Sequence, residues 1–125
     1  MEVQSMRCRG IRGATTVERN TREDILEATK ELLGMLIESN DLRSDDVATV
    51  FFTTTSDLNA EFPAMAARQM GWTDVSLLCG QEIPVPGSVP MCIRILILVN
   101  TDKTSQELNH VYIKGAKNLR SSVST

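Results

Sequence analysis

The stretch Cys92-Ile93-Arg94-Ile95-Leu96-Ile97-Leu98-Val99-Asn100 decides how this chain folds. Seven of its nine residues are apolar and suit a buried strand, and the other two are Arg94 and the terminal Asn100. A continuous aliphatic run of this length is typical of a central strand that is covered on both faces. The connector before it is rich in turn residues, namely Pro84, Pro86, Gly87 and Pro90. We therefore expect this strand to form the middle of a sheet.

Arg94 is the exception in that strand, and its charge needs an explanation. A guanidinium group cannot be deprotonated in a protein, and removing an unpaired charge from water costs a great deal of free energy. Arg94 therefore requires a carboxylate partner, an anionic ligand or an opening to water. A structural ion pair is one interpretation, and a cation at the floor of an anion-binding pocket is the other. The strand alone slightly favours the structural interpretation.

Length and composition place the chain among ordinary globular proteins. Its 125 residues predict one domain, 1–125, with one modest core, in which residues 1–5 form an extension and 121–125 a flexible tail. The net charge of −3, without a basic run, argues against a nucleic-acid partner. No apolar stretch approaches the roughly 20 residues that span a bilayer, so we expect no membrane partner. Met6 is an alternative start of translation.

The cysteines and the single histidine do not form a metal-binding pattern. Cys8, Cys79 and Cys92 include no Cys-x-x-Cys pair, and His110 stands apart from them. The start of the chain is neither basic nor apolar enough for a signal peptide. We therefore expect a cytoplasmic protein with reduced thiols, and neither a metal site nor a disulfide framework.

Hydrophobic periodicity and turn residues predict five strands and two helices. Thr21 precedes Asp24 by three residues, as at a capped helix start, and the apolar residues behind it continue to about Asn40. Phe62-Pro63-Ala64 places a proline in the first turn of the second helix, where no amide donor is lost. The predicted strands cover about residues 6–15, 48–55, 75–83, 92–100 and 110–114, and the helices about 21–40 and 60–70. This order predicts an α+β fold in which a mixed five-stranded sheet carries its helices on one side.

Side chains alternate along a strand, and here the alternation places several polar residues opposite the aliphatic faces. Arg94, Arg12 and Tyr112 each lie opposite aliphatic neighbours of their own strand. If these reverse faces meet, two guanidinium groups, a phenol and the carboxylate of Glu82 line one cavity. Such a cavity suits a small dicarboxylate that carries a hydroxyl, because arginine binds carboxylates bidentately and a glutamate accepts from a hydroxyl. A salt bridge between Glu82 and Arg94 would satisfy the same residues.

The chain resembles the monofunctional chorismate mutases of the trimeric α/β-barrel type along nearly its whole length, from about Met6 to Arg120. The opening Arg9-Gly10-Ile11-Arg12-Gly13-Ala14-Thr15-Thr16-Val17-Glu18 carries much of this resemblance. The remaining motifs follow in the expected order and spacing: Phe62-Pro63-Ala64, Ala67-Arg68, Gln81-Glu82, Pro86-Gly87-Ser88, Cys92-Ile93-Arg94, Asn100-Thr101-Asp102, His110-Val111-Tyr112 and Leu119-Arg120.

The resemblance implies an isomerase that converts chorismate to prephenate without a cofactor. It also implies a pseudo-barrel homotrimer whose active sites lie in clefts between subunits. Arg94 matches the arginine that contacts the ether oxygen and a carboxylate of the substrate, and Glu82 matches the residue that accepts from the ring hydroxyl. Arg12 and Tyr112 match carboxylate-binding positions, and Cys79 matches a strand position beside the hydroxyl.

The resemblance further implies a set of substrate-binding residues around the catalytic ones. An apolar wall, two strand residues beside it and two cations make up this set: Phe62, Ala64, Leu78, Gly80, Gln81, Arg68 and Arg120. Arg68 matches a cation near the mouth of the site. Arg120 matches a residue that closes over the substrate, although Leu119-Arg120-Ser121-Ser122 lacks the proline and the acid that often follow that arginine.

Three other interpretations stay open at this point. A trimeric imine deaminase-like enzyme would also place an arginine and a glutamate in clefts between subunits. A non-catalytic module that senses a small carboxylate or an aromatic amino acid would bind chorismate or prephenate without turnover. A plain structural ion pair would predict that the loss of Arg94 affects no ligand assay.

Overall fold

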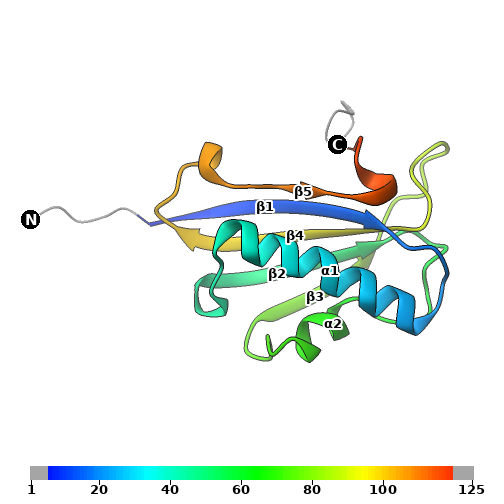
Figure 1. Ribbon diagram of the computed structural model, residues 1–125, viewed down its shortest axis with the longest axis horizontal. Helices are drawn as coiled ribbons and strands as arrows, with labels where there is room; N and C mark the ends of the chain where they lie inside the picture. Colours follow the sequence, from blue (N-terminus) through cyan, green and yellow to red (C-terminus); the bar gives the residue numbers. More distant parts are fainter. Residues whose placement is uncertain (1–5, 120–125) are drawn as a thin grey trace, which may run out of the picture.

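The structure, a computed structural model, describes residues 6–119 and contains one five-stranded sheet with helices on one of its faces (Figure 1). The strands lie in the order β3-β2-β4-β1-β5, so the predicted central strand is central. β4 runs antiparallel to β1 and β2, whereas the β2–β3 and β1–β5 pairs are parallel. The strands are β1 (Arg7–Thr16), β2 (Val47–Thr54), β3 (Ser76–Gln81), β4 (Cys92–Thr101) and β5 (Val111–Tyr112). The predicted mixed sheet of the α+β class is confirmed.

The main helix α1 (Arg22–Asn40) begins where its cap was predicted. The Thr21 hydroxyl accepts a hydrogen bond of 3.1 Å from the amide of Asp24, which satisfies one free amide at the helix start. The helix lies across the sheet in Figure 1 and buries its predicted apolar stripe. The core between helix and sheet contains Ile11, Leu32, Leu33, Leu36, Val50, Phe52, Ile95 and Ile97.

The second helix, α2 (Ala64–Gln69), is shorter than predicted and begins four residues later. A residue that precedes a proline is pushed away from helical backbone angles, so Phe62 cannot belong to a helix that continues through Pro63. Ala64 and Ala67 join the same core as α1, which places both helices on one side of the sheet. The predicted position of the helices is therefore confirmed, and the predicted start of the second one is wrong.

The other face of the sheet, which we call the reverse face, is less completely covered than predicted. Ile93, Ile95 and Ile97 are buried beneath the helices, but Leu96 and Leu98 stay partly exposed on the reverse face. The expectation of a central strand covered on both faces therefore fails within the described chain. Cover is present only at the end of the reverse face, where Ala116 and Leu119 pack against Ala14 and Cys92.

The extension 1–5, Arg120 and the tail 121–125 lie outside the described residues. Between residues 6 and 119, neither helix is long and apolar enough to cross a membrane. Within the same range, no group of three or more His, Cys, Asp or Glu side chains could hold a metal ion.

Candidate active site

One row of residues crosses the reverse face of the sheet and carries Arg94 at its centre. Thr53 on β2 is paired with Arg94 on β4, and Ala14 on β1 is paired with both Arg94 and Tyr112. Paired residues of adjacent strands point to the same face, so Tyr112 and Arg94 lie on the reverse face two strands apart, about 10 Å across Ala14. Arg12 lies on the same face, two residues before Ala14 on β1. Strand pairing therefore places Arg12, Arg94 and Tyr112 on one face of the sheet.

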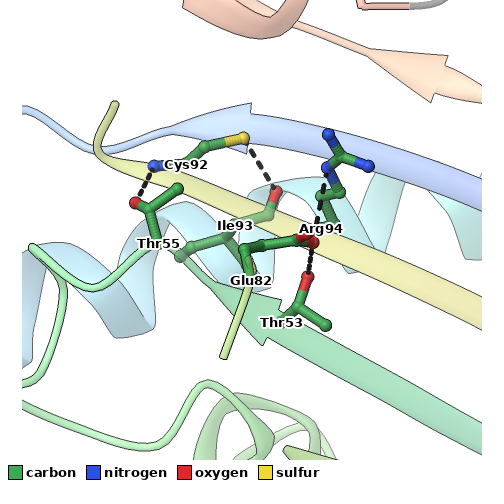
Figure 2. Close-up of polar contacts among 6 residues, drawn as sticks. All are labelled: Thr53, Thr55, Glu82, Cys92, Ile93 and Arg94. Atoms are coloured by element: carbon green, nitrogen blue, oxygen red, sulfur yellow. Dashed lines mark hydrogen bonds and ion pairs between the residues drawn. The ribbon is translucent and has the colours of Figure 1, made fainter. Parts of the chain in front are cut away.

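Glu82 comes directly after β3 and reaches Arg94 from the side, as Figure 2 shows. Its Oε2 accepts a hydrogen bond from the Thr53 hydroxyl and lies 3.5 Å from Nε of Arg94. The Arg94 side chain is 40% exposed and that of Glu82 is 25% exposed. A distance of 3.5 Å is longer than a good charged hydrogen bond, so the contact with Glu82 leaves the guanidinium group of Arg94 able to donate to a ligand. Arg94 thus has both a carboxylate partner and an opening to water.

A cavity of about 470 Å³ lies beside this pair. The connector that follows Glu82 forms one wall, and the segment after β5 forms another. The lining residues include Thr55, Glu82, Ile83, Val85, Cys92, Arg94, Gly115, Asn118 and Leu119. A permanent cation and a carboxylate at the edge of such a cavity suit an anion that also carries a hydrogen-bond donor. Arg12 and Tyr112 share the reverse face but do not line this cavity.

The Cys92 thiol forms an uncharged part of the wall next to Arg94. Burial raises the pKa of the Cys92 thiol, and the charge of Arg94 only partly offsets that effect. The thiol is therefore protonated at neutral pH and does not compete with Glu82 for the guanidinium group. Figure 2 shows Cys92 and Arg94 on the same side of β4.

The start of β4 is held by polar contacts that fix the position of Arg94. The Thr55 hydroxyl accepts a hydrogen bond of 2.9 Å from the amide of Cys92. Asp57 accepts from the Thr55 hydroxyl and, at 2.9 Å, from the amide of Met91. Met91 has a φ of 51°, an unfavourable value for a residue with a side chain, which the Asp57 contact supports. Arg94 therefore projects from a strand whose first residues are fixed by the segment that follows β2.

Arg12 and Tyr112 are held close to the pocket by the short parallel pairing of β1 with β5. The amide of Arg12 donates a hydrogen bond of 2.9 Å to Nδ1 of His110. Tyr112 packs against the small cluster that contains Ala14 and Cys92. A single residue with a small side chain, Ala14, lies between Tyr112 and Arg94 on the sheet. The two side chains are therefore close enough for a small dicarboxylate to contact both.

Four of the other predicted site residues, namely Phe62, Cys79, Gly80 and Gln81, line a second cavity of about 450 Å³. It is lined by Thr54, Leu58, Asn59, Ala60, Glu61, Phe62, Pro63, Cys79, Gly80 and Gln81. Cys79 is paired with Phe52, which is fully buried, so its thiol points to the helix-covered face rather than toward Arg94. Ala64 and Arg68 of α2 lie near this thiol. Within one chain, the structure therefore does not bring Cys79 and Arg94 together.

Burial also sets the chemical state of Cys79. Burial raises the pKa of the Cys79 thiol, while a backbone contact with Ala64 and the charge of Arg68 act in the opposite direction. The group is thus a neutral thiol at pH 7, able to donate a weak hydrogen bond but not to act as a strong nucleophile.

Two large apolar side chains near the second cavity have no cover within the described chain. Phe62 is 68% exposed, and Leu78 on the reverse face of β3 is 59% exposed. The loop that carries Phe62 is nevertheless fixed, because Glu61 accepts from the Phe62 amide at 2.9 Å and from Nε of Arg22 at 2.8 Å. The Phe62 amide is the main cause of a lowered pKa of Glu61. Phe62 is therefore presented to solvent by an ordered loop.

Sequence reasoning missed three polar residues of the site, namely Thr53, Thr55 and Asp57. In the sequence, the run Thr53-Thr54-Thr55 indicates only the end of a strand, because threonine is common in strands. The alternation of β2 assigns Thr53 and Thr55 to one face, but only strand pairing shows that this face contains Arg94.

Comparisons with known proteins agree on one family. The family model for chorismate mutase type I matches residues 8–123. The chain is 51% identical over 113 residues to chorismate mutase AroH of Thermus thermophilus, which covers 90% of this chain and 93% of that protein. It is 45% identical over 120 residues to chorismate mutase AroH of Bacillus subtilis (strain 168), covering 95% and 94%. The solved structure of chorismate mutase from Clostridium thermocellum (Cth-682) superimposes with a TM-score of 0.85 at 52% identity, covering 86% of this chain and 96% of that one.

Proposed function

The chain belongs to the chorismate mutase type I family, and from this premise we propose that the pocket at Arg94 is where its reaction takes place. The protein is an isomerase of aromatic amino acid biosynthesis that converts chorismate to prephenate. The observation that carries the assignment of the pocket is the pair of Arg94 and Glu82, loosely joined at 3.5 Å beside a cavity.

The conversion of chorismate to prephenate requires no nucleophile and no acid or base from the protein. The reaction is a Claisen rearrangement, in which electrons move around one six-membered ring without proton transfer or a covalent intermediate. The protein has to hold the substrate in the compact conformer that brings the reacting carbons together. It also has to stabilise the negative charge that develops on the ether oxygen as the carbon–oxygen bond breaks. A pocket of fixed cations and acceptors, without a nucleophile, suits both tasks.

Each polar side chain of the reverse face then has a distinct role. Arg94 donates to the ether oxygen and to a substrate carboxylate, using nitrogens that point away from Glu82 in Figure 2. Glu82 accepts from the ring hydroxyl, because an ionised carboxylate only accepts. Arg12 binds a carboxylate as a fork, and Tyr112 donates to it through its phenol. Loss of Arg12 should therefore raise KM at least as much as it lowers kcat.

The second cavity completes the site when a second copy of the chain is present. We propose a homotrimer in which the exposed Phe62 and Leu78 of one copy cover the Arg94 cavity of the next. Cys79, Gly80 and Gln81 lie beside these two side chains. Ala64 and Arg68 stand behind this wall and near the mouth. Two observations support the proposal: the apolar side chains are exposed on an ordered loop and strand, and the reverse face of β4 lacks full cover. We also propose a cytoplasmic location, and Arg120, which lies outside the described residues, stays a predicted substrate-binding residue.

The experiment that tests the proposed site is a chorismate assay on the wild-type protein and on Arg94→Ala. Removing one neutral donor at such a position costs roughly 10²–10³ in rate, and we expect Arg94→Ala to cost more because it removes a full charge. The decay of the diene absorbance of chorismate measures turnover directly. Near-normal turnover by Arg94→Ala would exclude this role for the arginine, and binding without turnover by the wild type would favour a sensing module.

The assembly has its own test. Sedimentation should show a trimer, and mixtures of Arg94→Ala with Phe62→Ala protein should regain part of their activity if sites lie between copies. A stable monomer with full activity would contradict the completed site.

A further inference from the structure

We propose that Thr53 is a positioning residue that keeps Glu82 from closing onto Arg94 and leaves one carboxylate oxygen free for the substrate hydroxyl. The inference rests on the proposed role of Glu82 as the acceptor of that hydroxyl. It concerns a residue on β2 that points to the reverse face and lies behind the cavity wall rather than in it.

Glu82 is held by β2 at two points, one on its backbone and one on its side chain. Its amide donates a hydrogen bond of 2.9 Å to the carbonyl of Thr54. Its Oε2 accepts from the Thr53 hydroxyl, and Figure 2 shows the same oxygen turned toward Nε of Arg94. Among residues 6–119, no group donates a hydrogen bond to its other oxygen, Oε1. The carboxylate is therefore anchored through one oxygen and open at the other.

Arg94 alone would not produce this arrangement. An arginine and a carboxylate in contact favour a two-point fork, which would engage both oxygens and two guanidinium nitrogens. Thr53 lies directly across the β2–β4 ladder from Arg94, and Figure 2 shows Oε2 of Glu82 between the Thr53 hydroxyl and Nε of Arg94. The hydroxyl competes for Oε2 and leaves the ion pair at 3.5 Å. Because threonine is neutral, it orients the carboxylate without cancelling the charge of Arg94.

The direct test is Thr53→Val, which keeps the size of the side chain and removes the donor. We expect kcat/KM for chorismate to fall roughly 10-fold or more, the range of a hydrogen bond to a charged group, with most of the change in KM. Thr53→Ser keeps the hydroxyl and should recover activity to within about 3-fold. If Thr53→Val does not fold, kcat and KM are measured on Thr53→Ala, which also lacks the hydroxyl and has a smaller side chain.

A matched control is Thr49→Val on the same strand and the same face. The Thr49 hydroxyl donates to the carbonyl of Ser76 at 2.8 Å and is remote from Glu82. Its loss should leave kcat and KM unchanged. If Thr49→Val and Thr53→Val reduce activity equally, the effect belongs to the strand and the proposal is wrong.

A double-mutant cycle separates this inference from the proposed function. In a Glu82→Gln background, adding Thr53→Val should change kcat/KM less than 2-fold, because the group that Thr53 orients is already altered. If Glu82→Gln alone is fully active, the proposed role of Glu82 fails. If Glu82→Gln is impaired but Thr53→Val is not, or if Thr53→Ser is as impaired as Thr53→Val, only the role of Thr53 is overturned.

Discussion

Ile95 and Leu96 are neighbours on β4, yet they belong to surfaces of opposite character. Ile95 is 2% exposed and joins a closed core with α1, whereas Leu96 is partly exposed between Arg12 on β1 and Phe51 on β2. The helix-covered face is complete within one chain. The reverse face combines aliphatic side chains with two arginines and lacks full cover. One face of this sheet therefore stabilises the fold, whereas the other carries the proposed site and, in the proposed assembly, the contacts between copies.

The strongest test of this contrast is Arg94→Lys on the reverse face. A lysine keeps the charge but is a point donor, so it cannot serve an ether oxygen and a carboxylate at the same time. We expect kcat/KM to fall at least about 10³-fold, while the thermal midpoint changes little because the residue is partly exposed. Steady-state kinetics and thermal unfolding of the same preparation measure both. Substantial activity in the lysine variant would mean that charge alone is sufficient.

The next test compares alanine at the two neighbouring positions of β4. Ile95→Ala should lower the free energy of unfolding by about 2–5 kcal/mol, as for other large-to-small changes in a closed core. Leu96→Ala should act mainly on the association of copies, so its effect should depend on protein concentration. Unfolding curves at several concentrations distinguish the two. Equal, concentration-independent effects would abolish the distinction between the faces.

A smaller effect is expected from two glycines of β1 that face opposite ways. A Cβ at Gly13 would lie 2.9 Å from Cδ1 of Leu36 and 3.1 Å from the carbonyl oxygen of Val111. Gly13→Ala should therefore cost about 1–3 kcal/mol of stability through crowding. A Cβ at Gly10 would meet Leu96 at an ordinary 3.4 Å, so Gly10→Ala should stay within about 0.5 kcal/mol. Similar unfolding midpoints for both variants would contradict the tighter packing of the helix side.

The smallest predicted effect is a dependence of stability on pH. Because burial raises the pKa of Cys92 above its ordinary value of 9.0, the unfolded chain loses this proton at a lower pH than the folded protein. The contribution of Cys92 to stability is therefore complete well below pH 9 and declines as the pH rises through and beyond that value, by at most about 1.4 kcal/mol per pH unit for one proton. Denaturant titrations at pH 8 and pH 10 should show a smaller decline in Cys92→Ala. Identical declines would mean that the thiol does not contribute.

The helix-covered face could be predicted from the sequence because its signals are local. The periodicity of residues 22–40, the Thr21 cap and the aliphatic run of β4 each follow from residues close in the chain. The predicted start of α2 is too early because a proline in the first turn also keeps the residue before it, Phe62, out of helical backbone angles.

The reverse face could be predicted only in part, because it depends on strand order and register. Alternation places Arg12, Arg94 and Tyr112 each opposite the aliphatic face of its own strand, but only the strand pairing shows that the three share one face of the sheet and that Cys79 pairs with the buried Phe52. Thr53 was missed for the same reason, since its contact with Glu82 joins residues 29 positions apart. The catalytic set was named through family resemblance, which supplies the long-range arrangement that local patterns lack.

The position of β1 in the sheet has a consequence for how the protein is made. β1 lies between β4 and β5, so Ala14 is paired with Arg94 on one side and with Tyr112 on the other. During translation, β1 leaves the ribosome long before either neighbour exists, and its edges stay without partners until then. Closing such long loops is entropically costly and slow, and an unpaired strand invites contact with other nascent chains. The last strand to be synthesised therefore both brings Tyr112 to the reverse face beside Ala14 and gives the first strand its second partner.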